Sequence, residues 1–392
     1  MSLSPAPGAT PGRTLAAIAL ALGAASAAAQ TAKPADAWTL TVRAEGAYES
    51  NPLYTAAEVQ DDFVTRWGAG VSRRLGSKRG HLEVDFEGGM LAYRTYGELD
   101  RFTWGAGLRG TRRLSRRVSL GVDARGSQGY ARDNPLATEA GVIPPYALTR
   151  TDAGNASLTY QLSRGWQGRL RVHGERFDFG SAALQNGWTA VARAGMQHGS
   201  SRSSTTGAYA ELERTSTAGL EYGIQRLAAT WGGTLTRGLT AELEAGAAIY
   251  RVVGGTSGDP ATDAARVTPT AGVGVDVRVR RHSLGARLER RVGQTYGLGT
   301  VGISRVASLE YGLELRARFG VAARAELTRV LSAAAVAEPL TRADNFNAGV
   351  RYGLTRLVTV RLDYSFWRRG EAGVEPRGHT VALSAGRRFS WR

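Results

Sequence analysis

Residues 358–366 read VTVRLDYSF. Its even-numbered positions hold Val, Val, Leu, Tyr and Phe, whereas its odd-numbered positions hold Thr, Arg, Asp and Ser. A period of two is the signature of a β-strand whose two faces meet different surroundings. The segment therefore predicts a strand with one apolar face and one charged face.

The same alternation runs through most of the chain after residue 37. Residues 82–90 (LEVDFEGGM) and 273–279 (VGVDVRV) repeat it, and no segment with helical spacing stands out. A soluble antiparallel sheet also alternates. Here, however, the polar positions carry ionised groups in strand after strand, and the apolar positions are rarely interrupted. This favours a sheet that has lipid on one side and water on the other.

The spacing of the strands indicates how the sheet closes. We count about eighteen strand candidates, with a range of 16–18. The connections after even-numbered strands are tight, as at 76–79, 164–165 and 280–281, and those after odd-numbered strands are mostly longer, as at 49–60, 131–146, 253–264 and 331–341. Short turns that alternate with long loops are typical of a bacterial outer-membrane barrel. The predicted fold is all-β, a transmembrane antiparallel up-and-down β-barrel.

The whole-chain composition narrows the class of protein. The 392 residues include 50 Lys+Arg and 34 Asp+Glu, a formal charge of +16, and no Cys. The absence of Cys excludes disulfides, thiolate metal sites and a Cys nucleophile. A mean hydropathy of −0.24 excludes a helical membrane protein. An Ala- and Leu-rich run after Arg13 predicts a signal peptide over residues 1–29, with a membrane anchor as the alternative. A short periplasmic segment (30–37) and the barrel (38–392) then follow.

The polar positions are expected to line the lumen. A barrel of 16–18 strands leaves an aqueous channel, and the protein-wide excess of arginine favours anions as permeating ions. A wall of ion pairs that keeps the barrel round is the alternative role for these charges. The pore-lining candidates are Glu83, Asp85, Glu87, Arg169, Arg171, Glu242, Glu244, Arg278, Arg287, Arg316, Arg324 and Arg361.

Two further features concern the mouth of the barrel and its lipid boundary. The longest loop, 131–146, contains Asp133 and Glu139, and it is a candidate constriction; a loop that stands in solvent is the alternative. Aromatic residues near strand ends, among them Tyr93 and Tyr250, are expected to form the interfacial bands that flank the apolar zone.

The last strand carries a recognisable pattern. Residues 384–391 read SAGRRFSW, with Ser384, Gly386, Phe389 and Trp391 at fixed spacing. This resembles the β-signal by which the outer-membrane assembly machinery recognises a barrel, and strand addition is a mode of recognition that such a pattern fits. The sequence departs from that pattern by ending on Arg392 rather than on the aromatic residue. The resemblance implies the assembly machinery as a partner, beside outer-membrane lipid.

The segment AEGAYESNPLY (44–54), followed by DDFVTRWGAGVSRRL (61–75), carries a second resemblance. It is similar to the opening of a family of outer-membrane β-barrel porins that often accompany exopolysaccharide export systems. The resemblance covers about 30 residues, and beyond them the similarity is architectural. It implies a location in the bacterial outer membrane and, as the narrower possibility, a polysaccharide exit pore.

Catalysis has little support in the sequence. The five histidines are scattered, and the nearest approach to a catalytic group is His173 with Glu175 and Asp178. No metal-binding, cofactor or nucleotide motif is present, and arginine spread over the whole chain is not a nucleic-acid patch. We therefore expect a pore for passive or gated passage of polar solutes, small anions or polysaccharide, without catalytic residues, metal or cofactor. The alternatives are a barrel hydrolase and a non-conducting surface scaffold or adhesin.

Overall fold

The computed structural model describes residues 36–52, 60–130, 147–180, 184–199, 203–217, 220–254, 265–295, 300–332, 339–370 and 375–391. Most of these residues lie in strands: β1 (Asp36–Ser50), β2 (Asp61–Ser77), β3 (Gly80–Tyr93), β4 (Arg101–Arg113), β5 (Val118–Tyr130), β6 (Leu148–Gln161), β7 (Trp166–Phe179), β8 (Gly187–Gly199), β9 (Ser204–Thr217), β10 (Leu220–Thr236), β11 (Leu239–Gly254), β12 (Arg266–Val279), β13 (His282–Thr295), β14 (Thr300–Arg316), β15 (Phe319–Ser332), β16 (Pro339–Gly353), β17 (Val358–Gly370) and β18 (Arg377–Trp391). A short 3-10 helix, η1 (Gly97–Leu99), lies between β3 and β4.

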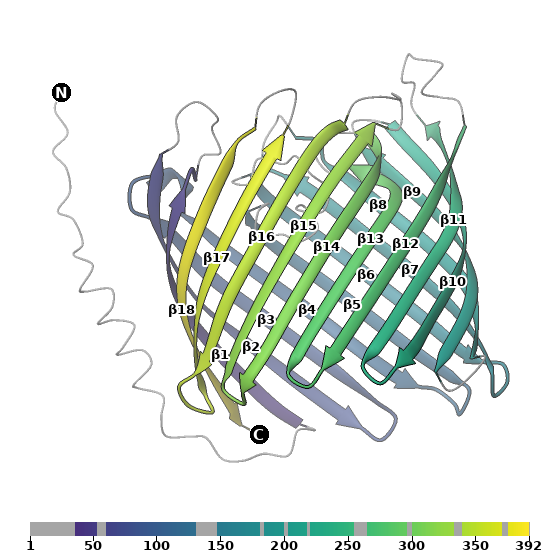
Figure 1. Ribbon diagram of the computed structural model, residues 1–392, viewed down its shortest axis with the longest axis horizontal. Coiled ribbons are helices and arrows are strands. Elements are labelled where there is room, and N and C mark those ends of the chain that lie inside the picture. The colour runs from purple at the N-terminus through teal and green to yellow at the C-terminus, as the bar shows by residue number, and fades with distance from the viewer. Residues whose placement is uncertain are drawn as a thin grey trace.

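The strands form one closed antiparallel barrel (Figure 1). Each strand pairs with the next along the chain, and β18 pairs with β1 from Trp38–Trp391 to Glu49–Thr380. Closure gives every strand two hydrogen-bonded neighbours, so the sheet has no open edge, which is what a sheet in hydrocarbon requires. The predicted barrel of about eighteen strands is confirmed. Among the described residues, no helix is long and apolar enough to cross a membrane.

The two rims of the barrel differ. The turns that follow even-numbered strands are tight, and β1 begins and β18 ends at the rim where these turns lie, which we call the short-turn rim. The turn after β10 needs Gly238, because its φ is +91° and a Cβ there would lie 2.1 Å from the Arg278 carbonyl oxygen. The opposite end is the long-loop rim. One of its connections is short, since only residues 218–219 separate β9 from β10.

The alternation seen in the sequence separates an outer face from an inner face. Large apolar side chains are exposed on the outer face, for example Leu227 (67% exposed), Val267 (71%) and Leu288 (61%). In β17, Leu362 is half exposed on the outer face, whereas Arg361 and Asp363 form an ion pair on the inner face. An apolar outer surface of this extent favours hydrocarbon over water.

The expected aromatic band is wrong at several positions: Tyr130, at the end of β5, is only 2% exposed, and two further tyrosines are also buried. Tyr93 and Tyr250 are each only 8% exposed and lie in two separate buried clusters on the inner side of the barrel. The reason is the parity of the residue number, because odd- and even-numbered residues of one strand point to opposite faces. Tyr93 shares the inner face with Glu87 on β3, and Tyr250 shares it with Glu244 on β11. Proximity to a strand end does not by itself direct a side chain toward lipid.

Candidate functional site in the barrel lumen

The inner face carries the charged residues that the sequence predicts for the lumen. β3 holds Glu83, Asp85 and Glu87, and the other strands contribute residues of the same parity: Arg169 and Arg171 on β7, Glu242 and Glu244 on β11, Arg278 on β12, Arg287 on β13, Arg324 on β15 and Arg361 on β17. Arg316 differs from these. It is the last residue of β14, beyond a register shift at the short-turn rim, so the strand's alternation does not place it in the lumen.

Many of these charges pair along the inner wall. Arg324 contacts Glu310 at 3.0 Å and Glu326 at 2.6 Å. Arg287 lies 3.9 Å from Glu242. Further contacts join Arg361 to Asp363 (3.2 Å), Arg171 to the Asn155 amide oxygen (2.6 Å), Arg125 to Glu87 (3.7 Å) and the Tyr209 hydroxyl to Glu244 (2.8 Å). Some of these pairs join residues of one strand and others join different strands, and together they leave the lumen polar.

The long-loop end of the β13–β14 hairpin separates from β12 and turns into the barrel. Pairing between β12 and β13 stops at Ala271–Arg290, although β12 continues to Arg266 against β11. Beyond that point β13 and β14 remain paired with each other as far as Thr295–Thr300, while β14 stays paired with β15 as far as Gly302–Ser332. We call residues 291–295 and 300–301 the inward hairpin.

Packing fixes the inward hairpin against the inner face of β10 and β11. Val292 and Val301, each 2% exposed, form one buried cluster with Tyr222 and Ile224 of β10 and with Ala248 and Tyr250 of β11. At the base of the hairpin, the Arg290 guanidinium donates to the Thr268 hydroxyl on β12 at 3.3 Å. Apolar contacts therefore hold a pair of strands across part of the lumen.

A buried arginine ties the inward hairpin to the wall. The Arg226 guanidinium donates to the Val292 carbonyl oxygen at 2.8 Å, and its other end pairs with Glu211. Arg193 also pairs with Glu211, through an Nε–Oε2 hydrogen bond of 2.6 Å. Glu211 is 4% exposed, so the two arginines compensate a carboxylate that burial would otherwise penalise. In the sequence, the alternation alone does not distinguish this group from the other charged residues of the inner face.

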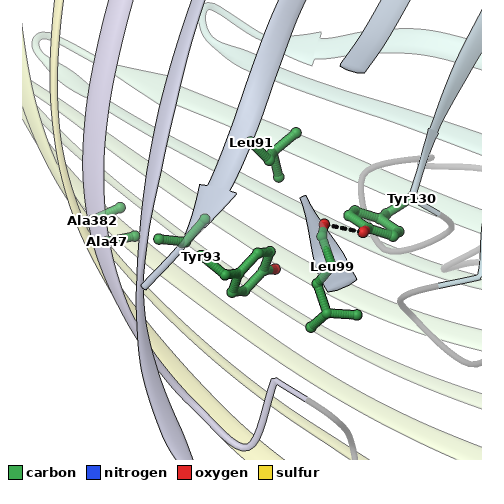
Figure 2. Packing of buried hydrophobic residues seen from close by; sticks show 7 residues of the cluster. Ala47, Leu91, Tyr93, Leu99, Tyr130 and Ala382 are labelled. Atoms are coloured by element: carbon green, nitrogen blue, oxygen red, sulfur yellow. Dashed lines mark hydrogen bonds between the residues drawn. The ribbon is translucent and has the colours of Figure 1, made fainter. Parts of the chain in front are cut away.

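A second element packs inward on the other side of the barrel. The Asp62 carboxylate accepts hydrogen bonds from the backbone N–H groups of Thr95 and Tyr96, at 3.0 and 3.1 Å, and so holds the segment before η1. Leu99 of η1 then packs with Tyr93, and its carbonyl oxygen accepts a hydrogen bond from Tyr130 (Figure 2). Because β3 and β12 are nine positions apart in a ring of eighteen strands, η1 and the inward hairpin lie on opposite walls.

A cavity of about 680 Å³ lies along the inner wall of β18 and β1–β6. Its lining includes polar and charged residues from these seven strands, with Arg43, Glu45, Arg66, Asp85, Glu87 and Arg125 among them. Arg66 is held at both ends of its guanidinium, by Glu45 at 2.5 Å and Glu49 at 2.6 Å. This part of the lumen is thus a polar space with fixed charges.

The N-terminal motif that carries the family resemblance closes the seam between the first and last strands. The Tyr48 hydroxyl donates to Asp61 at 2.8 Å, and the Ser50 hydroxyl accepts from the His379 backbone N–H at 2.8 Å. Asn51, with φ +58°, donates through its amide to the Arg377 carbonyl oxygen at 3.0 Å. These contacts give the motif a structural role in closure.

The remaining predicted residues are placed as follows. On β18, Ser384 and Gly386 have inner-face parity, whereas Phe389 and Trp391 have outer-face parity, with Trp391 opposite Trp38 of β1. His173 lies 3.7 Å from Glu175 (Nε2–Oε2), but Asp178 is on the other face of β7, so the three residues do not form a catalytic triad. Asp133 and Glu139 lie outside the described residues.

No protein-family model and no curated protein matches the chain. Similarity appears instead among solved structures. Acinetobacter baumannii OccAB4 aligns over 92% of this chain and 99% of its own, with a TM-score of 0.52 and 11% identity. Pseudomonas aeruginosa OccK2 (OpdF) aligns over 91% and 98%, with a TM-score of 0.51 and 13% identity.

A third solved structure, Pseudomonas aeruginosa OpdK with vanillate, aligns over 91% of this chain and 99% of its own, with a TM-score of 0.50 and 11% identity. These proteins are bacterial outer-membrane porins with barrels of eighteen strands. The chain described here therefore has the transmembrane barrel fold of the Occ/Opd outer-membrane porins.

Proposed function

We propose that this protein is an outer-membrane porin through which small polar solutes pass passively, at a lumen narrowed by the inward hairpin and η1. The observation that carries the proposal is the closed barrel with an apolar outer face, a charged inner face and a hairpin docked inside. A barrel of this size is too wide for side chains alone to fill. Folded-in segments are then what sets its narrowest point.

The experiment is single-channel recording of the refolded full-length barrel in a planar lipid bilayer. We expect steady conductance, because the charged lumen supports water and ions. The unmodified barrel is compared with a variant in which an Asn-Gly turn replaces residues 292–302, which removes the docked part of the hairpin. Its conductance should rise, and a control variant that replaces the turn at 354–357 with Asn-Gly should conduct like the unmodified protein.

A folded barrel that does not conduct would contradict the proposal. Folding is checked by far-ultraviolet circular dichroism and by the heat-dependent migration in gel electrophoresis that intact barrels show. Unchanged conductance on removal of the hairpin would contradict its role as the constriction while leaving the porin function in place.

The N-terminal resemblance supports a narrower cargo, an exported polysaccharide, although the structural neighbours lend it no support. Liposome-swelling assays with sugars of increasing chain length distinguish a solute porin from a polysaccharide exit pore. With a solute porin, the rate of liposome swelling should decline sharply as the sugar becomes longer. A polysaccharide exit pore should pass long linear oligosaccharides as well as short ones.

The C-terminal pattern supports the assembly machinery as a partner. Phe389 and Trp391 present aromatic side chains on the outer face of β18, and the backbone of this strand pairs with β1 in the finished barrel. Before closure, the edge of β18 would offer its hydrogen-bonding groups to a strand of the machinery, with the alternate aromatic residues supplying specificity.

A further inference from the structure

The outer face of β14–β18 carries a row of arginines at the long-loop rim. Each has outer-face parity and comes from a different strand; they are Arg305, Arg329, Arg342, Arg368 and Arg377. Below them along the strands the outer face is apolar, with Leu309 and Leu327, 50% and 52% exposed, as the nearest large side chains on β14 and β15. The row therefore marks the edge of the apolar zone.

The register places these positive charges directly beside one another. Arg329 of β15 is opposite Arg305 on one side and opposite Arg342 on the other, and Arg368 of β17 is opposite Arg377 of β18. Like charges on directly opposite residues destabilise a sheet. Three such pairs occur, two on β14–β16 and one on β17–β18, and an anion would offset their cost.

The carboxylates of this region balance only part of the charge. Asp344 accepts hydrogen bonds from Arg342 at 3.2 Å and from the Arg368 Nε at 2.9 Å, and this holds both guanidiniums in place. Glu375 interacts electrostatically with Arg368. Among the described residues, no hydrogen bond or ion pair reaches the side chains of Arg305, Arg329 and Arg377. Five arginines against two carboxylates leave a net charge of +3.

The same rim is neutral on β6–β10, at the other side of the barrel. There the outer-face charges form balanced pairs, each an arginine with its own carboxylate: Arg150–Asp152 at 3.1 Å, Arg176–Asp178 at 3.1 Å, and Arg214–Glu221. Arg251 of β11 is also exposed on the outer face of this rim. In the described part of the chain, however, it is the sector β14–β18 that carries outer-face arginines on successive strands.

The depth of the row corresponds to lipid headgroups. Immediately below Asp344 and Arg368 lies a cluster of aromatic rings, in which Phe346 is 6.3 Å from Tyr364 and Phe366 is 5.1 Å from His379. Aromatic residues of this kind occupy the boundary between hydrocarbon and headgroups. Arginine forms paired hydrogen bonds to phosphate, and clusters of basic residues just outside the hydrocarbon bind anionic headgroups.

We propose that the arginine row on β14–β18 binds the phosphate groups of an outer-leaflet lipid whose headgroup carries more than one phosphate. Long loops lie on the cell-surface side of such barrels, which places the row in the outer leaflet. The acyl chains of the bound lipid lie along the apolar outer face beneath the row, and its phosphates bridge arginines from adjacent strands. The inference does not depend on solute passage.

The test measures binding to the refolded full-length barrel in dodecyl maltoside micelles. Three probes are compared: lipid A, which carries two phosphates, phosphatidylglycerol, which carries one, and inorganic pyrophosphate. The test variant is Arg305→Gln/Arg329→Gln/Arg377→Gln, which removes the three arginines that have no partner in the described part of the chain. The matched control, Arg150→Gln/Arg176→Gln/Arg214→Gln, removes the same charge from the same rim on the neutral side.

We expect lipid A to bind the unmodified protein more tightly than phosphatidylglycerol does, and to lose affinity about tenfold or more in the test variant, since several charge-assisted hydrogen bonds are lost. The control should bind like the unmodified protein. An equal loss of affinity for lipid A in the test variant and in the control variant would indicate general charge attraction and would overturn the proposed site. Pyrophosphate binding as tight as lipid A binding would overturn the lipid as the ligand. Circular dichroism verifies that all variants are folded.

Discussion

At the residue scale, the period-two pattern predicts which face a side chain occupies but not what covers it. Arg171 and Arg324 have the predicted inner-face parity, because alternation along a strand is strict. Arg226 was missed, although a signal is present. The inner-face positions before it on β10, Leu220, Tyr222 and Ile224, are apolar. Apolar residues on the face that is expected to line an aqueous lumen indicate that something covers them, and here the inward hairpin supplies the cover.

The contact between Arg226 and Val292 leads to a prediction for Arg226→Met. The substitution removes the hydrogen bond from the guanidinium to the Val292 carbonyl oxygen, while Glu211 retains Arg193 as its partner. A hydrogen bond from a charged donor contributes about 1.5–3 kcal/mol, so the undocked population of the inward hairpin should rise about tenfold or more. Single-channel recordings should show frequent steps to a higher conductance level. Arg193→Met is the matched control, because Arg193 also pairs with Glu211 but is not hydrogen-bonded to the hairpin. Equally frequent conductance steps in both variants would contradict the role of Arg226 as the anchor of the hairpin.

At the element scale, the strands were predictable and the direction of one hairpin was not. β12 and β13 alternate apolar and polar residues in the same way, yet only β13 leaves the wall beyond Arg290. What decides this is the packing of Val292 and Val301 against Tyr222 and Ile224, residues about 70 positions earlier in the chain. A local pattern carries no information about a contact between strands so distant in sequence. For the same reason, loop length points to loop 131–146 as a candidate constriction, a prediction that lies outside the described residues, whereas the docked β13–β14 hairpin has no such signal in its length.

The last strand carries the prediction that belongs to this scale. Phe389→Ser/Trp391→Ser should reduce the amount of barrel in the outer membrane of expressing cells several-fold, because both aromatic side chains of the proposed assembly signal are lost. The purified variant should still refold into detergent micelles, since β18 pairs with β1 through its backbone. Phe102→Ser/Leu108→Ser on β4 removes two exposed outer-face side chains outside the signal, and it controls for the loss of apolar surface. If both double variants reach the membrane in equal amounts, the last strand is not the recognised signal.

At the scale of the whole molecule, the net charge of +16 does not describe the lumen. The composition leads to an expectation of anion preference, but the structure distributes the arginine excess elsewhere. Arg280 and Arg281 lie in a turn at the short-turn rim, and the row on β14–β18 faces outward. Within the lumen, arginines such as Arg287, Arg324 and Arg361 are paired with carboxylates. A pore responds to the charges that line its path, so position rather than total charge governs selectivity.

The expected ion selectivity is therefore weak. Reversal potentials measured across a KCl gradient should give permeabilities of chloride and potassium that differ by no more than about threefold, in line with paired charges along the wall. Arg43 and Arg388 line the cavity beside β1, and neither has a side-chain partner among the described residues, so Arg43→Gln/Arg388→Gln should shift the reversal potential toward potassium. Arg305→Gln/Arg329→Gln removes the same charge from the outer face and should leave it unchanged. Two outcomes would contradict this prediction: a strong chloride preference in the unmodified pore, or an equal shift of the reversal potential in both variants. Either result would mean that the total charge of the protein acts on the permeating ions, although the barrel separates inner from outer arginines.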